Sequence, residues 1–137
     1  MKRHTILSIA SLFALSLTAC TQEGPQPIQF GKDDCDHCKM TITEDSFATE
    51  LVTDKGRVYK FDDLSCMEAY EKEHPEHAEK AHLYVSDFLD KKLIPLETAT
   101  LISGGEIKSP MNGNTAAFSD SQKAEEYAQK LNAQLLP

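Results

Sequence analysis

The chain has 137 residues, of which 22 are acidic and 14 basic, with four Cys and no Trp. This length suits one ordinary domain, or two very small halves that share a core. Without Lys2 and Arg3, which lie in a segment that we expect to be removed, the chain keeps 12 basic and 22 acidic residues, a net charge near −10. Such an acidic surface disfavours binding to nucleic acid or to anionic lipid, so no nucleic-acid partner is expected.

Residues 1–19 have the order of a bacterial lipoprotein signal peptide. A short positive region is followed by an apolar run from residue 6 to 17, and small residues then lead into Cys20. The apolar run is too short to span a bilayer. We therefore expect cleavage before Cys20 and a lipid on its sulfur; the alternative is an ordinary secretory signal with a chance Cys. The lipid would hold the protein on the exported side, at the outer membrane facing the periplasm if the host has two membranes.

Residues 20–33 are predicted to be the lipidated Cys and a flexible tether. The segment "TQEGPQPIQFGKD" holds two Pro and two Gly and shows no periodicity. As a flexible coil, it would reach on the order of 20 Å. The folded domain is then expected over residues 34–137.

The first half of this domain reads as a hairpin followed by a helix. Residues 47–53 alternate and are rich in β formers, "DKGR" is a turn, and residues 58–61 form a second strand. Asp62 can cap a helix that begins at "LSCMEAY", and Pro75 should end or bend it. A short strand follows at residues 82–85.

The second half repeats this order. Residues 98–103 and 115–118 are predicted strands, and a helix follows with Ser119 and Gln122 as a capping box. Three residues recur at an offset of 57, namely Phe61, Asp63 and Tyr70 as Phe118, Asp120 and Tyr127. The triplet at 51–53 recurs at 101–103, an offset of 50, which makes the second turn seven residues longer. Two related halves, about 34–85 and 86–137, should pack together because each is too small to bury a core alone.

The stretch "DDCDHCKMTI" gathers Cys35, His37, Cys38 and Met40 into six positions. With Cys20 lipidated, three Cys remain, so at least one thiol stays outside any disulfide. A redox Cys-x-x-Cys needs a helix after the second Cys to lower a thiol pKa, and "KMTITED" is β- and turn-like instead. A resting disulfide between Cys35 and Cys38 stays open.

Zinc and monovalent copper are the two metal hypotheses. A zinc finger would need His ligands at short spacing, but 35 residues separate Cys38 from His74. We expect His74 and His77 to be solvated. Cu(I) prefers thiolate and thioether sulfur, and on an extended segment Cys38 and Met40 point to the same face while His37 faces away.

Three further sulfur residues differ in their expected roles. Met111 lies in a polar Gly- and Asn-rich loop, where a core role is poorly explained, so it is a candidate ligand from the second half. Met67 falls on the apolar face of the first helix and is expected in the core. Cys66 stays open between a buried structural thiol and a ligand.

Five motifs together resemble the NosL family of nitrous oxide reductase accessory lipoproteins: the lipoprotein Cys, "CDHCKM", "VYKFDDLSCM", "YVSDF" and "SPMNGNTAAF". The resemblance implies an α+β fold of two related ββαβ-type halves. It implies a Cu(I)-binding chaperone, without catalysis, that delivers copper to nitrous oxide reductase, with a copper-exporting membrane protein as a further partner. The family's copper sulfurs fall on Cys38 and Met40, with Cys35 and Met111 as further ligands.

Two positions depart from the family pattern. Lys39 stands where the family often has Gly between Cys and Met, and Asn112 stands where Gly commonly follows the second Met. Two other functions compete with the chaperone hypothesis. One is a thiol-disulfide oxidoreductase that uses Cys35 and Cys38, and the other is a structural lipoprotein whose Cys pair is a plain crosslink.

Overall fold

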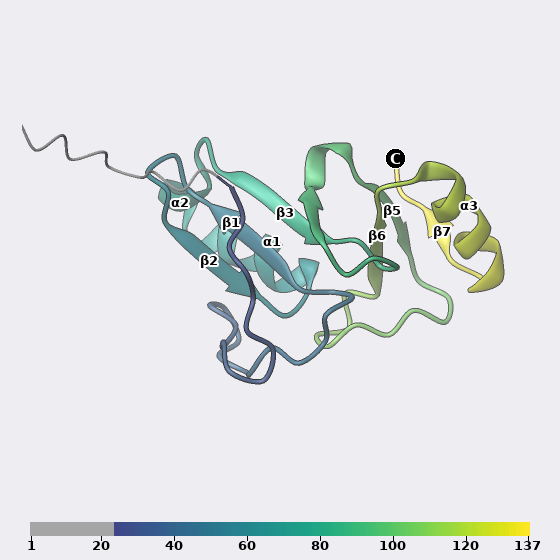
Figure 1. Ribbon diagram of the computed structural model, residues 1–137, viewed down its shortest axis with the longest axis horizontal. Coiled ribbons are helices and arrows are strands. Elements are labelled where there is room, and N and C mark those ends of the chain that lie inside the picture. Colours follow the sequence, from purple (N-terminus) through teal and green to yellow (C-terminus); the bar gives the residue numbers. More distant parts are fainter. Residues whose placement is uncertain (1–23) are drawn as a thin grey trace, which may run out of the picture.

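The computed structural model describes residues 24–137, so the predicted signal peptide and Cys20 lie outside the described part. Two small sheets lie side by side along the long axis of the molecule (Figure 1). Within residues 24–137, no helix is both long enough and apolar enough to cross a bilayer.

The first sheet has four antiparallel strands in the order β2-β1-β3-β4. Its strands are β1 (Thr49–Val52), β2 (Val58–Phe61), β3 (His82–Ser86) and β4 (Leu93–Pro95). Between β2 and β3 the chain forms α1 (Leu64–Glu73) and the short α2 (Pro75–Ala78), which begins at the proline that ends α1. A single 3-10 turn follows β4 at Leu96–Thr98.

The second sheet has three antiparallel strands in the order β6-β5-β7. Its elements are β5 (Thr100–Ser103), β6 (Thr115–Phe118), α3 (Ser121–Lys130) and β7 (Gln134–Leu135). In both halves, a hairpin is followed by a helix and then by a strand that pairs with the first strand of the hairpin. The predicted α+β fold of two ββαβ halves is therefore confirmed.

Side-chain packing supports the same correspondence. Phe61 packs on Tyr70 with ring centroids 5.2 Å apart, and their counterparts at an offset of 57, Phe118 and Tyr127, lie 5.6 Å apart. Both helices are also capped by an aspartate at this offset. Asp63 accepts a hydrogen bond from the backbone N–H of Cys66, and Asp120 accepts from two backbone N–H groups of α3. The offset-57 match thus identifies equivalent positions.

The offset of 50 between the first strands of the hairpins is wrong by one residue. Leu51 pairs with Tyr59, whereas the position 57 residues after Tyr59 is Ala116, which pairs with Ile102. Leu51 therefore corresponds to Ile102, and both are fully buried. The loops between the strands cover residues 53–57 and 104–114, five and eleven residues, so the second is six residues longer.

The two short strands β4 and β7 could not be predicted from the sequence, because two or three residues are too few to show alternation. β4 pairs with β3 and so belongs to the first sheet. The first half therefore extends to about residue 95, past the predicted boundary between 85 and 86. β7 closes the second sheet against β5.

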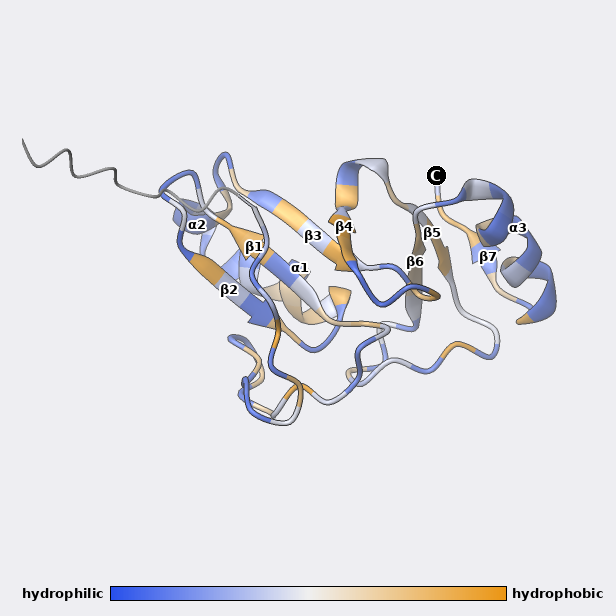
Figure 2. Ribbon diagram, in the orientation of Figure 1, coloured by the Kyte–Doolittle hydropathy of each residue, from blue (hydrophilic) through white to orange (hydrophobic). Residues whose placement is uncertain are grey.

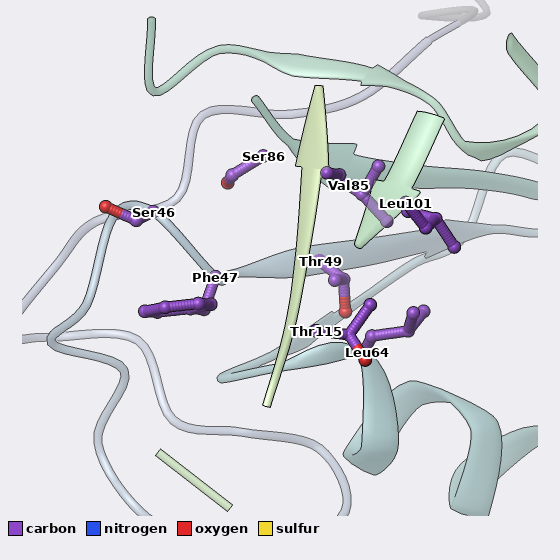
Figure 3. A pocket seen from close by; sticks show the side chains of 9 residues that line it. Ser46, Phe47, Thr49, Leu64, Val85, Ser86, Leu101 and Thr115 are labelled. Atoms are coloured by element: carbon purple, nitrogen blue, oxygen red, sulfur yellow. The ribbon is translucent and has the colours of Figure 1, made fainter. Parts of the chain in front are cut away.

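The two halves share a core. Ala117 of β6 and Leu101 of β5 pack into the cluster that is built around α1. A cavity of about 10 Å³, room for about one water, remains between the halves, and Figure 3 shows Leu64, Val85 and Thr115 around it. The second core is smaller, since α3 buries only Ala124 and Ala128 and is hydrophilic over most of its length (Figure 2).

The predicted capping box at the start of α3 is wrong. Ser119 donates its backbone N–H and its hydroxyl to Asp87 Oδ2, both at 2.7 Å, and so joins the end of β3 to the second half. Asp120 caps the helix in its place, because its carboxylate reaches the N–H groups of Gln122 and Lys123.

Residues 26–33 also differ from the expected flexible tether. The backbone N–H of Gln26 donates to Glu50 Oε2 at 2.8 Å, and Gly31 donates to the Ile42 carbonyl at 2.8 Å. Lys60 forms an ion pair with Asp33 at 2.7 Å. The segment packs because its backbone and charged groups find partners on the first sheet and on the 33–42 hairpin, a pairing that local composition does not reveal.

Candidate metal centre

The Cys-x-x-Cys-x-Met run forms a closed hairpin loop and not the expected extended segment. Asp34 and Thr41 form an antiparallel bridge, and inside it the backbone N–H of Cys35 donates to the Met40 carbonyl at 2.8 Å. Asp36 exchanges two hydrogen bonds of 2.8 Å with the backbone of Lys60 in β2. The loop is thereby fixed beside the end of β2.

Both departures from the NosL pattern fall on left-handed backbone. Lys39 has φ 65° and Asn112 has φ 61°. Glycine adopts this conformation without steric cost, Asn tolerates it, and a long side chain such as Lys is strained there. Both positions therefore favour glycine, and Asn112 suits the backbone conformation better than Lys39 does.

Four side chains converge below this loop and are named here the thiol cluster: Cys35, Cys38, Asp62 and Cys66. One ligand atom from each, Sγ or a carboxylate oxygen, lies within 4.8 Å of the others. Cys35, Asp62 and Cys66 are buried, whereas Cys38 is partly exposed. All three thiols are free. The cluster is therefore closed on the protein side and reachable at Cys38.

Asp62 brings an unpaired carboxylate oxygen to the cluster. Its Oδ2 accepts a hydrogen bond from the Cys38 thiol at 3.3 Å, but its Oδ1 is buried with no hydrogen-bond partner. A buried carboxylate oxygen without a partner is costly in free energy. The sequence suggested Asp62 as the cap of α1, but the next residue, Asp63, caps this helix instead.

The thiols lack the activation that a redox Cys-x-x-Cys uses. Burial, together with hydrogen bonds to Cys35 and Asp62, raises the pKa of the Cys38 thiol to about 11. Burial also raises the pKa of the Cys66 thiol above its ordinary value. Cys38 lies in a turn, and no helix begins directly after it as it would in a redox Cys-x-x-Cys.

Asp63 ties the second half to this centre. Its Oδ1 accepts from the Cys66 backbone N–H and from Ser65, while its Oδ2 accepts from the Ser109 hydroxyl at 2.7 Å and the Met111 N–H at 3.0 Å. Burial raises the pKa of Asp63, but these hydrogen bonds outweigh it and hold the pKa below its usual value. The 104–114 loop is thereby fixed at the start of α1.

The two candidate thioethers lie outside the buried part of the thiol cluster. Met40 is hydrogen-bonded to Cys35 through the backbone, and the residue is 57% exposed. Met111 is 36% exposed on a loop whose Gly113 approaches Ser65 so closely that an added Cβ would lie 2.8 Å from the Ser65 Cβ. The structure thus brings Cys35 and Cys38 together and places the Met111 backbone at the helix that carries Cys66.

The NosL family model matches residues 27–137, most of the chain. The chain belongs to the NosL family. Its structure is similar to the crystal structure of the copper chaperone NosL from Shewanella denitrificans, with 22% sequence identity and a TM-score of 0.70. The similarity covers 82% of this chain and 91% of that one. A comparison with curated proteins finds no match.

Asp62 and Cys66 extend the candidate site of this NosL-family chain beyond the residues chosen from its sequence. Asp62 precedes the N-cap Asp63 and lies outside α1, whereas Cys66 lies in the first turn, so the two meet at the N-terminal end of this helix. The available signal was an acidic residue and a Cys close together at a predicted helix start. It was obscured because either residue of the Asp62–Asp63 pair could have capped the helix.

The histidines near the site occupy less solvated positions than predicted. His37 lies in the loop, with its Nδ1 3.2 Å from Oε2 of Glu73 in the last turn of α1. His74 and His77 pack against Tyr70, with ring centroids 4.3 and 5.9 Å away. His74 and His77 are therefore only partly solvated, because their side chains, 40% and 29% exposed, also pack on Tyr70 of α1 and Tyr59 of β2.

Proposed function

We propose that this NosL-family protein is a membrane-anchored metallochaperone that carries one Cu(I) and performs no catalysis. The observation that supports this most directly is the convergence of three free thiols and Asp62 within 4.8 Å. Thiolate sulfur suits Cu(I), and the partnerless Oδ1 of Asp62 is an acceptor that a cation would satisfy. Copper is the cargo of this site.

Exposure of the thioethers supports transfer over storage. Cys38, Met40 and Met111 are the reachable sulfur residues, whereas Cys35 and Cys66 are buried. We propose that Cys35, Cys38, Met40 and Met111 hold the ion, with Asp62 and Cys66 behind them. An acceptor protein can then replace the outer thioethers first, and the ion leaves without opening the core.

The partners and the anchor complete the proposal. The similarity to the copper chaperone NosL from Shewanella denitrificans supports a copper protein as partner. We propose nitrous oxide reductase as the acceptor and a copper-exporting membrane protein as the donor. The lipid on Cys20 would hold the protein to the membrane, with residues 21–25 as the remaining link to the folded domain.

Substitution of Met40 by Leu tests the copper proposal against its two competitors. This change removes the sulfur and keeps the side-chain bulk, so Cu(I) retention against a chelator should weaken while thiol–disulfide exchange stays unchanged. The exposed Leu89, replaced by Ala, is the matched control and should change neither. Equal copper retention in wild type and both variants, together with redox activity, would favour the oxidoreductase. No copper-dependent gain in stability would favour a structural role.

The acceptor and the anchor need separate measurements. Cu(I)-loaded protein mixed with copper-free nitrous oxide reductase should transfer its metal, and transfer should fall when Cys38 is replaced by Ser. Expression of Cys20→Ala should release the protein from the membrane fraction without changing its copper binding. Failure of transfer would contradict the proposal that nitrous oxide reductase is the acceptor. The proposal of a Cu(I) site would not be affected, because the chelator experiment tests it separately.

A further inference from the structure

A second group of metal-binding side chains lies at the opposite end of α1 from Cys66. It consists of His74, Glu76 and His77, named here the histidine cluster, whose donor atoms lie within 4.8 Å of one another. His74 follows the last residue of α1, and Pro75 begins α2, so the three donors sit on one short and stiff segment. The sulfur chemistry proposed above does not use them.

The distances between the donors are close to those of a bound ion. Glu76 Oε1 lies 3.4 Å from His74 Nδ1 and 3.8 Å from His77 Nε2. With bonds of about 2.0–2.2 Å, ligand atoms of a tetrahedral site lie about 3.3–3.6 Å apart. Both imidazoles therefore face one carboxylate oxygen, and shifts of less than about 1 Å would place all three atoms around a metal.

His77 is oriented as metal-binding histidines usually are. Its Nδ1 lies 2.9 Å from the hydroxyl of Tyr70, a buried residue, which can accept the ring N–H. When the Tyr70 hydroxyl accepts the Nδ1 proton, the Nε2 lone pair on the Glu76 side is available to a metal. The Tyr59 hydroxyl, 3.3 Å from Nε2, makes the weaker contact that a metal would displace. The rings of Tyr59 and His77 also stack with centroids 4.8 Å apart, which fixes the imidazole.

Charge and access also favour a cation. The cluster lies at the C-terminal end of α1, where the helix dipole is negative, and beside the acidic Glu73. The side chains of His74, Glu76 and His77 are 40%, 63% and 29% exposed, so an ion can enter and keep a water as a fourth ligand. Two imidazoles and one carboxylate suit borderline divalent ions and lack the sulfur that Cu(I) prefers.

We propose that the histidine cluster is a second metal site, which takes a borderline divalent cation of the Zn²⁺ or Cu²⁺ type. It lies apart from the thiol cluster, since the ten residues of α1 correspond to about 15 Å of helix. The two sites differ in their ligand atoms: the site at the start of α1 offers sulfur, and the site at its end offers nitrogen and oxygen.

Zn²⁺ titration of the untagged chain carrying Cys35→Ser, Cys38→Ser and Cys66→Ser tests this site, because the three thiols of the thiol cluster no longer compete for the ion. One Zn²⁺ should bind saturably per chain, and Cu²⁺ should give a spectrum of nitrogen and oxygen ligation. Adding His74→Ala should lower the affinity at least about tenfold. His82→Ala is the control, exposed at the start of β3 and outside the cluster, and should change the affinity less than twofold.

A second measurement covers the case in which the triple variant fails to fold. In reduced wild type, Zn²⁺ should shift the imidazole NMR signals of His74 and His77 and leave those of His82 in place. Absence of a shift at His74 and His77 would overturn the proposal. So would a triple variant that folds and shows no saturable binding, or binding that His74→Ala and His82→Ala weaken equally.

Discussion

The two halves have the same ββαβ order but unequal chemistry. In the first half, α1 buries Leu64, Met67 and Tyr70 and begins at the thiol cluster. In the second half, α3 buries two alanines and begins at exposed residues, and the position equivalent to Cys66 is Lys123. The second half compensates with its eleven-residue loop, which reaches across to Asp63. One half supplies the buried donors, and the other supplies a loop that is held beside them at the start of α1.

This difference shows how a duplicated scaffold can acquire a single asymmetric site. The N-cap aspartate exists in both halves, but only at Asp63 does it also hold a loop of the other half. A capping residue thus also forms a link between the halves. Changes at equivalent positions should therefore have unequal effects, which the following predictions compare.

The largest contrast is expected between Asp63→Ala and Asp120→Ala. Loss of the exposed Asp120 cap should lower the free energy of unfolding by about 1 kcal/mol. Loss of Asp63 removes a cap and leaves the buried Ser109 hydroxyl and the Met111 N–H without their acceptor, so a decrease of about 3 kcal/mol is expected. Urea denaturation of the reduced protein measures both. Equal effects would contradict the role of Asp63 as the link between the halves.

A pH-dependent contrast is expected at Glu50, whose register equivalent in the second half is Leu101. Burial raises the pKa of Glu50 to about 7, against the lowering effect of the Gln26 N–H. Between its ordinary pKa near 4.5 and about 7, the folded chain holds a proton that the unfolded chain has lost. Stability should therefore fall as pH rises through this window, by on the order of 2 kcal/mol.

Glu50→Gln is the variant that isolates this effect. The amide keeps an acceptor for the Gln26 N–H and does not ionise, so the stability of the variant should depend less on pH between 5 and 8. Urea midpoints of both proteins across this range provide the measurement, and their difference removes the contribution of the histidines. The same slope in wild type and variant would exclude Glu50 as the source.

The smallest contrast is expected at the two left-handed positions of the site loops. Lys39→Gly relieves a steric cost of about 1 kcal/mol and adds a chain-entropy cost of about 0.5–1 kcal/mol, so the net gain should be at most about 0.5 kcal/mol. Asn112→Gly should be neutral within about 0.3 kcal/mol, because Asn tolerates this conformation. Thermal unfolding provides the comparison. A loss of 1 kcal/mol or more at Lys39→Gly would show that its side chain holds the loop.

Much of the scaffold could be predicted from local pattern. The strands at 58–61 and 115–118, the start of the second helix near residue 120 and the end of the first at Pro75 depend on alternation, capping residues and proline, which act over a few residues. Met67 is fully buried, as its place on the apolar face of the first helix predicted. The predicted offset of 50 between the first strands of the two hairpins was wrong by one residue. Residues 51–53 and 101–103 are similar in type, but the strand register makes Leu51 equivalent to Ile102.

The site could be predicted only in part. The Cys-x-x-Cys run was visible, but the hairpin that closes it depends on a bridge between Asp34 and Thr41, and on Asp36 binding to β2. The placement of Asp62 and Cys66 beside these thiols arises from that long-range contact. The packing of residues 26–33 and of the histidine cluster also depends on partners distant in sequence. The copper ligand set itself stays a prediction.

Anaerobic competition for Cu(I) between the fully reduced protein and a strong chelator tests the central claim most directly. We predict that wild type retains one Cu(I) per chain and that the Cys38→Ser variant loses it. The control variant Ser121→Ala, changed at the start of α3, should retain it. Wild-type protein that surrenders all its copper to the chelator would contradict the account. Cys38→Ser protein that keeps its copper as well as wild type would contradict it too.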